Sequence, residues 1–233
     1  MAASDGAIFT DAEDFVRALR KARIELVVAG PGVFWARLTR VVLPHLTLLA
    51  ISGSLSRTAY IAWRPERACV ASPARMDLSS VWGDVRLQRG HLVFHSRGER
   101  LHQRTNGPTE CGLLSLGPKR LATVGRALTG RDLISPPSGR ILQLARRDMT
   151  RLMRLHAAAA RFAERQPKLI LSADVIRAMQ HDLIEALALP GDGSRCRGPG
   201  KVAVVSILGR RGVRAAGDRD LHRGRLFGCF AAS

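Results

Sequence analysis

The spacing of apolar residues changes once along this chain, from a strand pattern to a helix pattern near Leu116. Between Ile24 and Leu116, short apolar runs are separated by turn sequences such as Gly30-Pro31-Gly32 and Asn106-Gly107-Pro108. Many short strands with no intervening helix predict an antiparallel barrel or a double-sheet roll. The strand-like runs are Phe34 to Thr39, Leu46 to Ile51, Thr58 to Trp63, Ala68 to Ala71, Val85 to Leu87, Leu92 to His95 and Cys111 to Leu116.

Helical spacing dominates between Pro118 and Pro190. Pro118 suits a first helical turn, and Gly130 can end that helix. Asp148 and Ser172 are candidate caps for two further helices, because apolar residues recur at helical spacing after each of them. The last two helices can form an antiparallel pair, which either covers the roll or makes a dimer contact.

The beginning of the chain predicts one more helix, over about residues 11–22. Thr10 and Glu13 have the spacing of a capping box, and Phe15 and Leu19 then share a helical face. The sequence therefore predicts an α+β protein, an antiparallel β-roll followed by a small group of helices. Its segments are a helical segment (1–23), the roll (24–130), a helical segment (131–190) and a basic Gly/Arg-rich tail (191–233).

The positive charge of the chain has two readings. The formal net charge is +18, which is typical of nucleic-acid-binding proteins, but the basic residues are 33 Arg and only 4 Lys. A GC-rich genome produces the same bias through its arginine codons. The charge is also uneven, since residues 191–233 carry 9 basic and 3 acidic residues and so hold +6 of the total.

The sequence predicts a cytoplasmic protein. The longest apolar run, Val41 to Ile51, is interrupted by Pro44 and His45 and is too short to span a bilayer. The N-terminal residues have no basic segment followed by an apolar one, as a secretory signal would. The four cysteines are far apart in the sequence and form no CxxC pair, which favours reduced thiols.

Several segments, in this order and spacing, resemble a subgroup of AraC-type transcriptional regulators over about residues 8–189. The strongest match is the run Gly90 to Thr105, which reads Gly-His-Leu-Val-Phe-His-Ser-Arg-Gly-Glu-Arg-Leu-His-Gln-Arg-Thr. The others are Thr10-Asp-Ala-Glu-Asp-Phe, Glu25-Leu-Val-Val-Ala-Gly, Phe34-Trp-Ala-Arg-Leu, Leu46-Thr-Leu-Leu, Gly112-Leu-Leu-Ser-Leu and Gly125-Arg-Ala-Leu-Thr-Gly-Arg-Asp-Leu.

The resemblance implies a cupin-like sensor domain at 24–130, a helical linker or dimerisation segment at 131–190, and then a domain with two helix-turn-helix units. It also implies an unknown small-molecule effector and a homodimer. Residues 191–233 do not offer two helix-turn-helix units, so we expect no specific DNA binding by this chain alone. The expected function is the ligand-sensing part of a regulator, without catalysis and without a cofactor.

The candidate ligand site is the interior of the roll. Trp35, Trp63 and Trp82 could line a pocket by apolar contact, or they could be ordinary core and rim residues. His91 and His95 fall on one face of a strand and could also meet a ligand, although structural roles are common for such histidines. Residues that could orient a polar or anionic group are Arg97, Arg100 and His102.

Two other functions are alternatives to the sensor. A cupin-fold enzyme would need a metal set that begins with His-x-His, but the sequence has none, and Glu99 does not stand at the matching distance. We therefore expect no bound metal. A nonspecific nucleic-acid-binding protein could act through the basic tail, but the tail has only Phe227 and Phe230 as aromatic residues for base stacking.

The tail itself has two interpretations. Past Pro190 the helical spacing ends, and 9 of the 43 residues are Gly. A natural linker can have this composition, and so can a GC-rich gene read in the wrong frame. Shifting the frame by one nucleotide from Asp220 onward permits codons for a segment that resembles the approach to the family's first helix-turn-helix. We therefore expect an out-of-frame, disordered tail.

Overall fold

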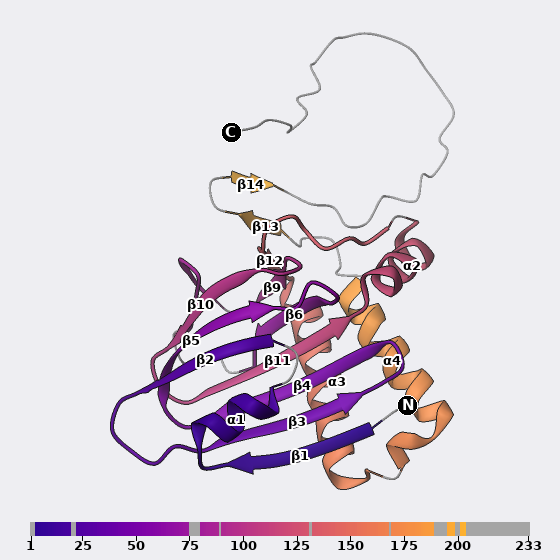
Figure 1. Cartoon of the computed structure of the whole chain (residues 1–233). Coiled ribbons are helices and arrows are strands. Elements are labelled where there is room, and N and C mark those ends of the chain that lie inside the picture. Colours follow the sequence, from indigo (N-terminus) through magenta and orange to yellow (C-terminus); the bar gives the residue numbers. More distant parts are fainter. Residues whose placement is uncertain are drawn as a thin grey trace, which may run out of the picture.

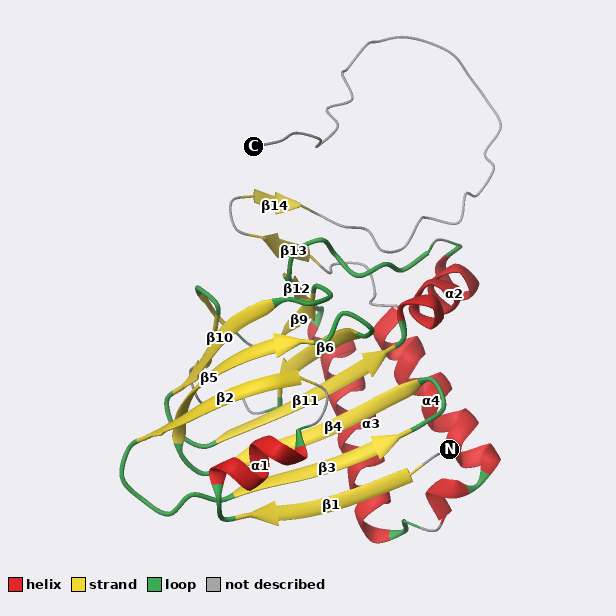
Figure 2. Cartoon of the chain, viewed as in Figure 1, coloured by secondary structure: helices red, strands yellow, loops and turns green. Residues whose placement is uncertain are grey.

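The structure, a computed structural model, describes residues 3–19, 22–74, 80–88, 90–130, 132–167, 169–188, 195–198 and 201–203. Two antiparallel sheets face each other, and helices cover the outer face of the larger one (Figures 1 and 2). The prediction of an α+β protein with an antiparallel β-roll followed by helices is confirmed. No helix in the described ranges is long and apolar enough to cross a membrane.

The larger sheet has the strand order β1-β3-β4-β11-β6-β9-β12-β13-β14, with antiparallel neighbours throughout. Its central strands are buried on both faces, which explains their continuous apolar sequences. The strands are β1 (Ala3–Phe9), β3 (Ala36–Val42), β4 (Leu46–Gly53), β6 (Ala68–Pro73), β9 (His91–His95), β11 (Thr109–Leu116), β12 (Arg140–Gln143), β13 (Arg195–Gly198) and β14 (Lys201–Ala203).

The smaller sheet has the order β2-β5-β10-β7-β8. Its strands are β2 (Ala22–Ala29), β5 (Ser56–Trp63), β7 (Ser80–Trp82), β8 (Val85–Arg86) and β10 (Arg100–Thr105). Every second residue of β5 is buried, which is the pattern of a strand with one face toward the core.

Two apolar cores result from this layering. Leu48 and Leu114 belong to the core between the larger sheet and the helices, whereas their neighbours Leu49 and Leu113 belong to the core between the sheets. Successive side chains of a strand point to opposite faces, so one strand supplies both cores. The core between the sheets is the place where a ligand could be enclosed.

Three longer helices follow the roll: α2 (Pro118–Thr129), α3 (Arg146–Arg165) and α4 (Ala173–Ala188), with the short 3-10 helix η1 (Leu169–Leu171) between α3 and α4. Helix α3 packs on the larger sheet against β1, β3 and β4, and α4 packs against α3, η1 and α2. The helical pair therefore covers the roll, which was the structural alternative to a dimer contact.

Helix α1 (Ala12–Ala18) follows β1 in the chain and precedes β2, and it packs against β1, β2 and β3 (Figure 1). The Asp11 carboxylate caps it by accepting hydrogen bonds from the backbone N–H groups of Glu13 and Asp14 at 2.8 and 2.9 Å. The predicted helix over 11–22 is thus shorter, and its cap is Asp11 rather than Thr10. Its apolar face buries Phe15, and Leu19 follows directly after the helix.

Other differences from the prediction concern the edges of the roll. Residues 1–23 contain strand β1, and residues 131–190 contain strand β12, and both strands pair into the larger sheet. Helix α3 begins after Ala145, so Asp148 lies in its first turn and is not the cap. The prediction of a disordered tail falls on residues outside the described ranges, except that Arg195–Gly198 and Lys201–Ala203 form β13 and β14.

Candidate ligand-binding site

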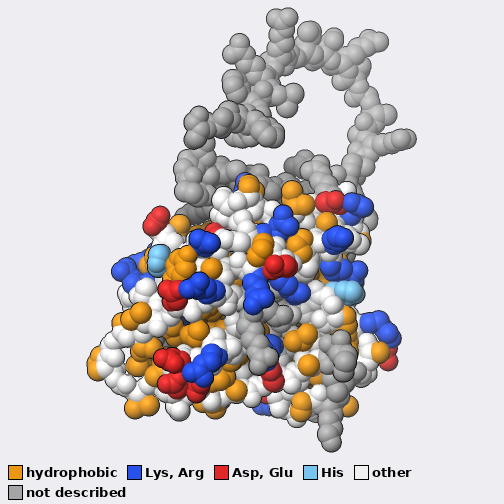
Figure 3. Space-filling model, viewed as in Figure 1, with side chains coloured by type: hydrophobic (Ala, Val, Ile, Leu, Met, Phe, Trp, Pro, Cys, Tyr) orange, Lys and Arg blue, Asp and Glu red, His pale blue; other side chains and the backbone are white. Residues whose placement is uncertain are grey.

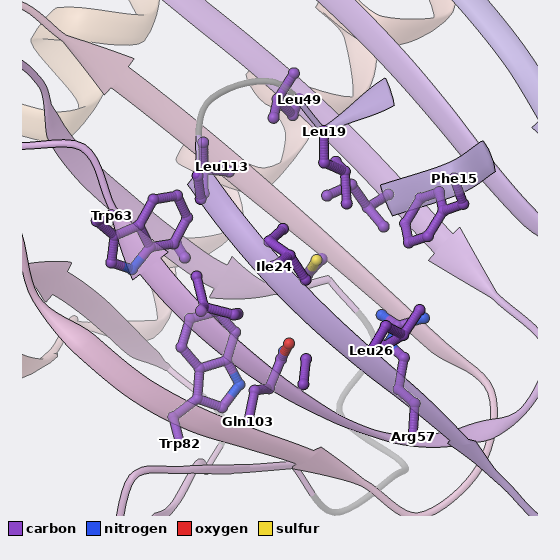
Figure 4. Close-up of a pocket in the computed structure, with 16 residues that line it drawn as sticks. Phe15, Leu19, Ile24, Leu26, Leu49, Arg57, Trp63, Trp82, Gln103 and Leu113 are labelled. Carbon is purple, nitrogen blue, oxygen red and sulfur yellow. The ribbon is translucent and has the colours of Figure 1, made fainter. Parts of the chain in front are cut away.

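A cavity of about 60 Å³ lies between the two sheets, beside α1. Figure 4 shows Trp63 at one end of it and Arg57 at the other. Most of the lining is apolar, and residues come from α1 and from strands of both sheets. The lining residues are Phe15, Leu19, Ala22, Ile24, Leu26, Leu49, Ile51, Arg57, Ala59, Ile61, Trp63, Ala71, Trp82, Gln103, Cys111 and Leu113.

Strand β5 runs along the length of the cavity. Arg57, Ala59, Ile61 and Trp63 alternate with outward-facing residues, so all four side chains point inward. Arg57 and Trp63 are six positions apart in the sequence, which is about 20 Å of extended strand. The cavity is therefore lined by a cationic group at one end and by an indole ring at the other.

The Arg57 end is the polar part of the cavity. Arg57 is 5% exposed, and burial lowers the pKa of its guanidinium from the usual value. A second cavity of about 20 Å³ shares Arg57, Trp82, Gln103 and Cys111 with the first, so the polar end extends toward β7 and β11. Burial raises the pKa of the Cys111 thiol, which keeps this neighbour of Arg57 uncharged.

The two tryptophans of the cavity contact a buried histidine. The ring of His95 lies 4.8 Å from that of Trp63 and 5.4 Å from that of Trp82, centroid to centroid. Its Nδ1 atom lies 2.8 Å from Oε2 of Glu99, and the backbone N–H of Ser96 donates to the same oxygen at 3.1 Å. Burial lowers the pKa of His95, although Glu99 opposes this, so the imidazole is neutral. The ring packs against both indole rings and is not part of the cavity lining.

The structure brings only part of the sequence-predicted site together. Trp63 and Trp82 line the cavity, and His95 lies against both of them. His91 is also buried, but its Nδ1 accepts a hydrogen bond from the backbone of Gln88 and it does not line the cavity.

The remaining predicted residues lie outside the cavity. Trp35 is 42% exposed and forms a backbone hydrogen bond with the Ser54 hydroxyl at 3.0 Å. Arg97, Arg100 and His102 are exposed, and the ring of His102 lies against that of Tyr60 on the outer face of the smaller sheet. The odd-numbered residues of β10 face inward, and His102 is even-numbered.

Sequence reasoning missed the polar residues that do line the cavity, Arg57 and Gln103. The signal was available for Arg57, because it continues the inward-facing alternation of Ala59, Ile61 and Trp63 by one step. An arginine at an inward position of a strand is rare and indicates a buried ionic role. Gln103 gave no such signal, because β10 was not recognised as a strand.

Within the described ranges, one group of residues could hold a metal ion by proximity alone. It consists of His181, Asp182 and Glu185 on α4, whose ligand atoms lie within 4.8 Å of one another. His181 and Asp182 are exposed, and Glu185 forms an ion pair with Arg151 of α3. This group lies on the helices, away from the interior of the roll, and neither His91 nor His95 belongs to it.

No profile of a known protein family matches this chain, and no curated protein matches it. The solved structures that are similar to parts of it include the following three. The AraC-like transcriptional activator CuxR has a TM-score of 0.49 and 12% identity, over 81% of this chain and 72% of that chain. The EutQ protein of Clostridium difficile has a TM-score of 0.29 and 10% identity, over 48% and 95%. Vicilin from Corylus avellana (hazelnut) has a TM-score of 0.18 and 10% identity, over 75% and 52%. Because all three scores are below 0.5, we base the functional proposal on this chain's own residues.

Proposed function

We propose that this chain is the ligand-sensing part of an AraC-type transcriptional regulator, with the cavity between the sheets as its effector site. The cavity is the observation that carries the proposal. It is enclosed by two sheets and α1, its lining is mostly apolar, and a few polar groups lie at one end. Small-molecule sites have this composition, in which apolar contact supplies affinity and a few polar groups set orientation.

The sequence supports the regulatory part of the proposal. The motifs that resemble AraC-type regulators extend over residues 8–189, which includes the roll and all three longer helices. The roll supplies the cavity, and α3 and α4 are packed on the opposite face of the larger sheet. This order of sensor first and helices second is what the resemblance implies.

A binding role fits the cavity better than catalysis does. The nucleophile available there is the Cys111 thiol, and burial raises its pKa, so it is held in the unreactive protonated form. His95 is separated from the cavity by its contacts with Trp63 and Trp82. We accordingly propose that the protein is not an enzyme. We also propose that it acts in the cytoplasm, which the widely spaced cysteines favour.

The charged surface argues against nucleic-acid binding by the roll. On the face shown in Figure 3, basic side chains are interspersed with acidic and apolar ones. Among the described residues, seven ion pairs tie arginines to exposed or half-exposed carboxylates: Arg17 with Glu13 and Asp14, Arg23 with Glu25, Arg40 with Asp5, Arg126 with Asp132, Arg151 with Glu185, and Arg177 with Asp174. We propose that specific DNA recognition does not belong to residues 3–188.

Two further proposals follow from the resemblance. The first is a homodimer, which sedimentation equilibrium tests directly, and a monomer at all concentrations would contradict it.

The second proposal is that residues 191–233 arise from a shifted reading frame. The nucleotide sequence tests it, because the next frame downstream of codon 190 must stay open for about a hundred codons to encode two helix-turn-helix units.

The test of the proposed function is a ligand screen on two matched variants of β5. Ala59→Leu places a larger side chain into the cavity, whereas Ala62→Leu places the same side chain on the outer face of the same strand. We expect compounds from a small-molecule library that raise the Tm of the wild-type chain to do so for Ala62→Leu and to fail for Ala59→Leu. Hits that stabilise both variants equally would place the effector site elsewhere.

A further inference from the structure

Arg57 differs from the other inward-facing residues of the roll because it carries a charge. Its side chain is 5% exposed, and no ion pair found among the described residues includes it. Its backbone N–H donates to Thr105 Oγ1 at 3.2 Å, which fixes the strand rather than the guanidinium. Buried cations in proteins are normally paired, because an unpaired one loses its hydration without compensation.

Other arginines of the structure show how such a charge is usually accommodated. Arg40 forms an ion pair with Asp5, and the half-buried Arg67 donates from Nε to Ser115 Oγ at 2.8 Å. For Arg57 the electrostatic neighbour is the Cys111 thiol, whose raised pKa leaves it uncharged. Glu110 lines the second cavity together with Arg57, but no ion pair between them is found among the described residues.

The backbone around Arg57 makes room for its guanidinium. A Cβ atom at Gly53 would lie 2.4 Å from Nη1 of Arg57, which is closer than real contacts allow. Gly53 pairs with Thr109 of β11 and with Ala36 of β3. Because Gly53 has no side chain, the larger sheet leaves space there for the guanidinium of Arg57. This space lies at one end of the cavity.

The rest of the cavity restricts what the partner of Arg57 can be. Between Arg57 and Trp63 the lining is apolar, with Leu26, Ile24 and Ile61 among its members. The cavity is small, which favours a small ligand over a bulky polyanion. A guanidinium matches a planar carboxylate through two parallel hydrogen bonds, and Gln103 beside it can donate a third from its amide.

We propose that the effector is a small monocarboxylate with an apolar body, whose carboxylate pairs with Arg57 and whose body lies along β5 toward Trp63. This inference rests on the proposed function, since it assigns the chemical class of the ligand to the same cavity. It adds that recognition depends on one buried arginine, Arg57.

The experiment uses the full chain and two probe pairs that differ only in charge. The probes are hexanoate and 3-phenylpropanoate, each compared with its primary amide, and inorganic phosphate at the same ionic strength. We expect both carboxylates to raise the Tm and both amides and phosphate to leave it unchanged. The variants are Arg57→Met and, as the matched control, Arg104→Met on the outer face of the neighbouring strand β10.

Arg57→Met should weaken carboxylate binding by at least about tenfold, because a charge-assisted pair is lost. It should also raise the Tm of the ligand-free chain by about 2–4 °C, because an unpaired buried charge is removed. Arg104→Met should change neither. The comparison of acid with amide on the wild-type chain needs no variant, so the proposal remains testable even if Arg57→Met does not fold.

Three results would overturn the inference. Amides that bind as well as acids, phosphate that binds as well as the carboxylates, or carboxylates that bind Arg57→Met unchanged would each exclude the assigned pairing. If the carboxylates fail while other library compounds bind the wild type and Ala62→Leu but not Ala59→Leu, the inference falls and the sensor proposal stands. If no compound binds the cavity at all, both fall.

Discussion

The imidazole of His156 on α3 lies directly against the backbone of Gly112 in β11. A Cβ atom at Gly112 would lie 2.9 Å from both Nε2 and Cε1 of His156, and the Nε2 atom is 3.0 Å from the carbonyl oxygen of Leu49. His156 is 5% exposed, so its ring reaches from the helix layer into the larger sheet. A polar contact thus fixes α3 to the two strands whose other faces line the cavity.

Gly112→Ala should destabilise the fold by about 1–3 kcal/mol, because the added methyl group overpacks this contact. Urea denaturation measures the change. The double variant Gly112→Ala with His156→Ala should recover part of the loss, because the smaller side chain accommodates the methyl group. Effects that simply add would show that the two residues do not interact.

Stability should fall as the pH decreases below about 6.5. Burial lowers the pKa of His156 to about 4, although hydrogen bonds to Leu49 and Leu113 oppose this, and burial lowers the pKa of His95 as well. A histidine with a lowered pKa in the folded state stabilises above its unfolded pKa and loses this contribution as the pH falls through that value. For His156 the loss between pH 6.5 and about 4 amounts to roughly 3 kcal/mol.

The free energy of unfolding, measured by urea denaturation at a series of pH values, tests this dependence. His156→Gln keeps an amide donor for the Leu49 carbonyl and removes the titrating group, so its stability should decline less steeply between pH 6.5 and 4. His181→Gln, on the exposed surface of α4, should behave as the wild type does. A stability that rises toward pH 4 would contradict the buried neutral imidazole.

Glu99→Ala should lower both the stability and the order of the tryptophan end of the cavity. The Glu99 carboxylate accepts hydrogen bonds from His95 Nδ1–H and from the Ser96 backbone, so its removal leaves two donors without this acceptor. We expect a loss of about 1–3 kcal/mol, and a changed near-ultraviolet circular dichroism signal from Trp63 and Trp82. Asp132→Ala, which removes an exposed carboxylate paired with Arg126, should change neither.

Mobility-shift assays on this chain should show at most weak, sequence-independent DNA binding. Basic side chains on a folded surface attract phosphates through counterion release, so any binding should weaken steeply as the salt concentration rises. A footprint at a defined site that persists at physiological salt would contradict the proposal that this chain alone does not bind DNA specifically.

The sequence predicted the roll because its strands carry a local signal. Alternating burial and turn glycines are properties of neighbouring residues, and Gly107 at the β10–β11 turn indeed has a φ of +126°. Strand β12 was missed because its four residues are recognisable only through their pairing with β9, 45 or more residues earlier. Edge strand β1 was missed for the same reason, since its partner β3 lies far along the chain.

The candidate site was predicted in part, and the reason is geometric. The two tryptophans that line the cavity lie in strands at inward positions, whereas Trp35 precedes its strand and faces solvent. Arg97 and His102, which belong to the strongest motif, lie in a turn and on the outer face of β10. Arg57 comes close to Gln103 and Cys111 only through pairing of β5 with β10 and packing of the two sheets, which no local pattern specifies.

The most direct test of the effector site is ¹⁹F NMR on the chain labelled with 5-fluorotryptophan. Trp63 and Trp82 line the cavity and Trp35 lies outside it, so the three resonances separate cavity binding from surface binding in one spectrum. Each library compound that stabilises the chain should shift the Trp63 and Trp82 resonances and leave that of Trp35 unchanged, and these shifts should vanish in Ala59→Leu. Compounds that shift Trp35 alone, or that shift the cavity resonances equally in Ala59→Leu, would contradict a ligand site between the two sheets.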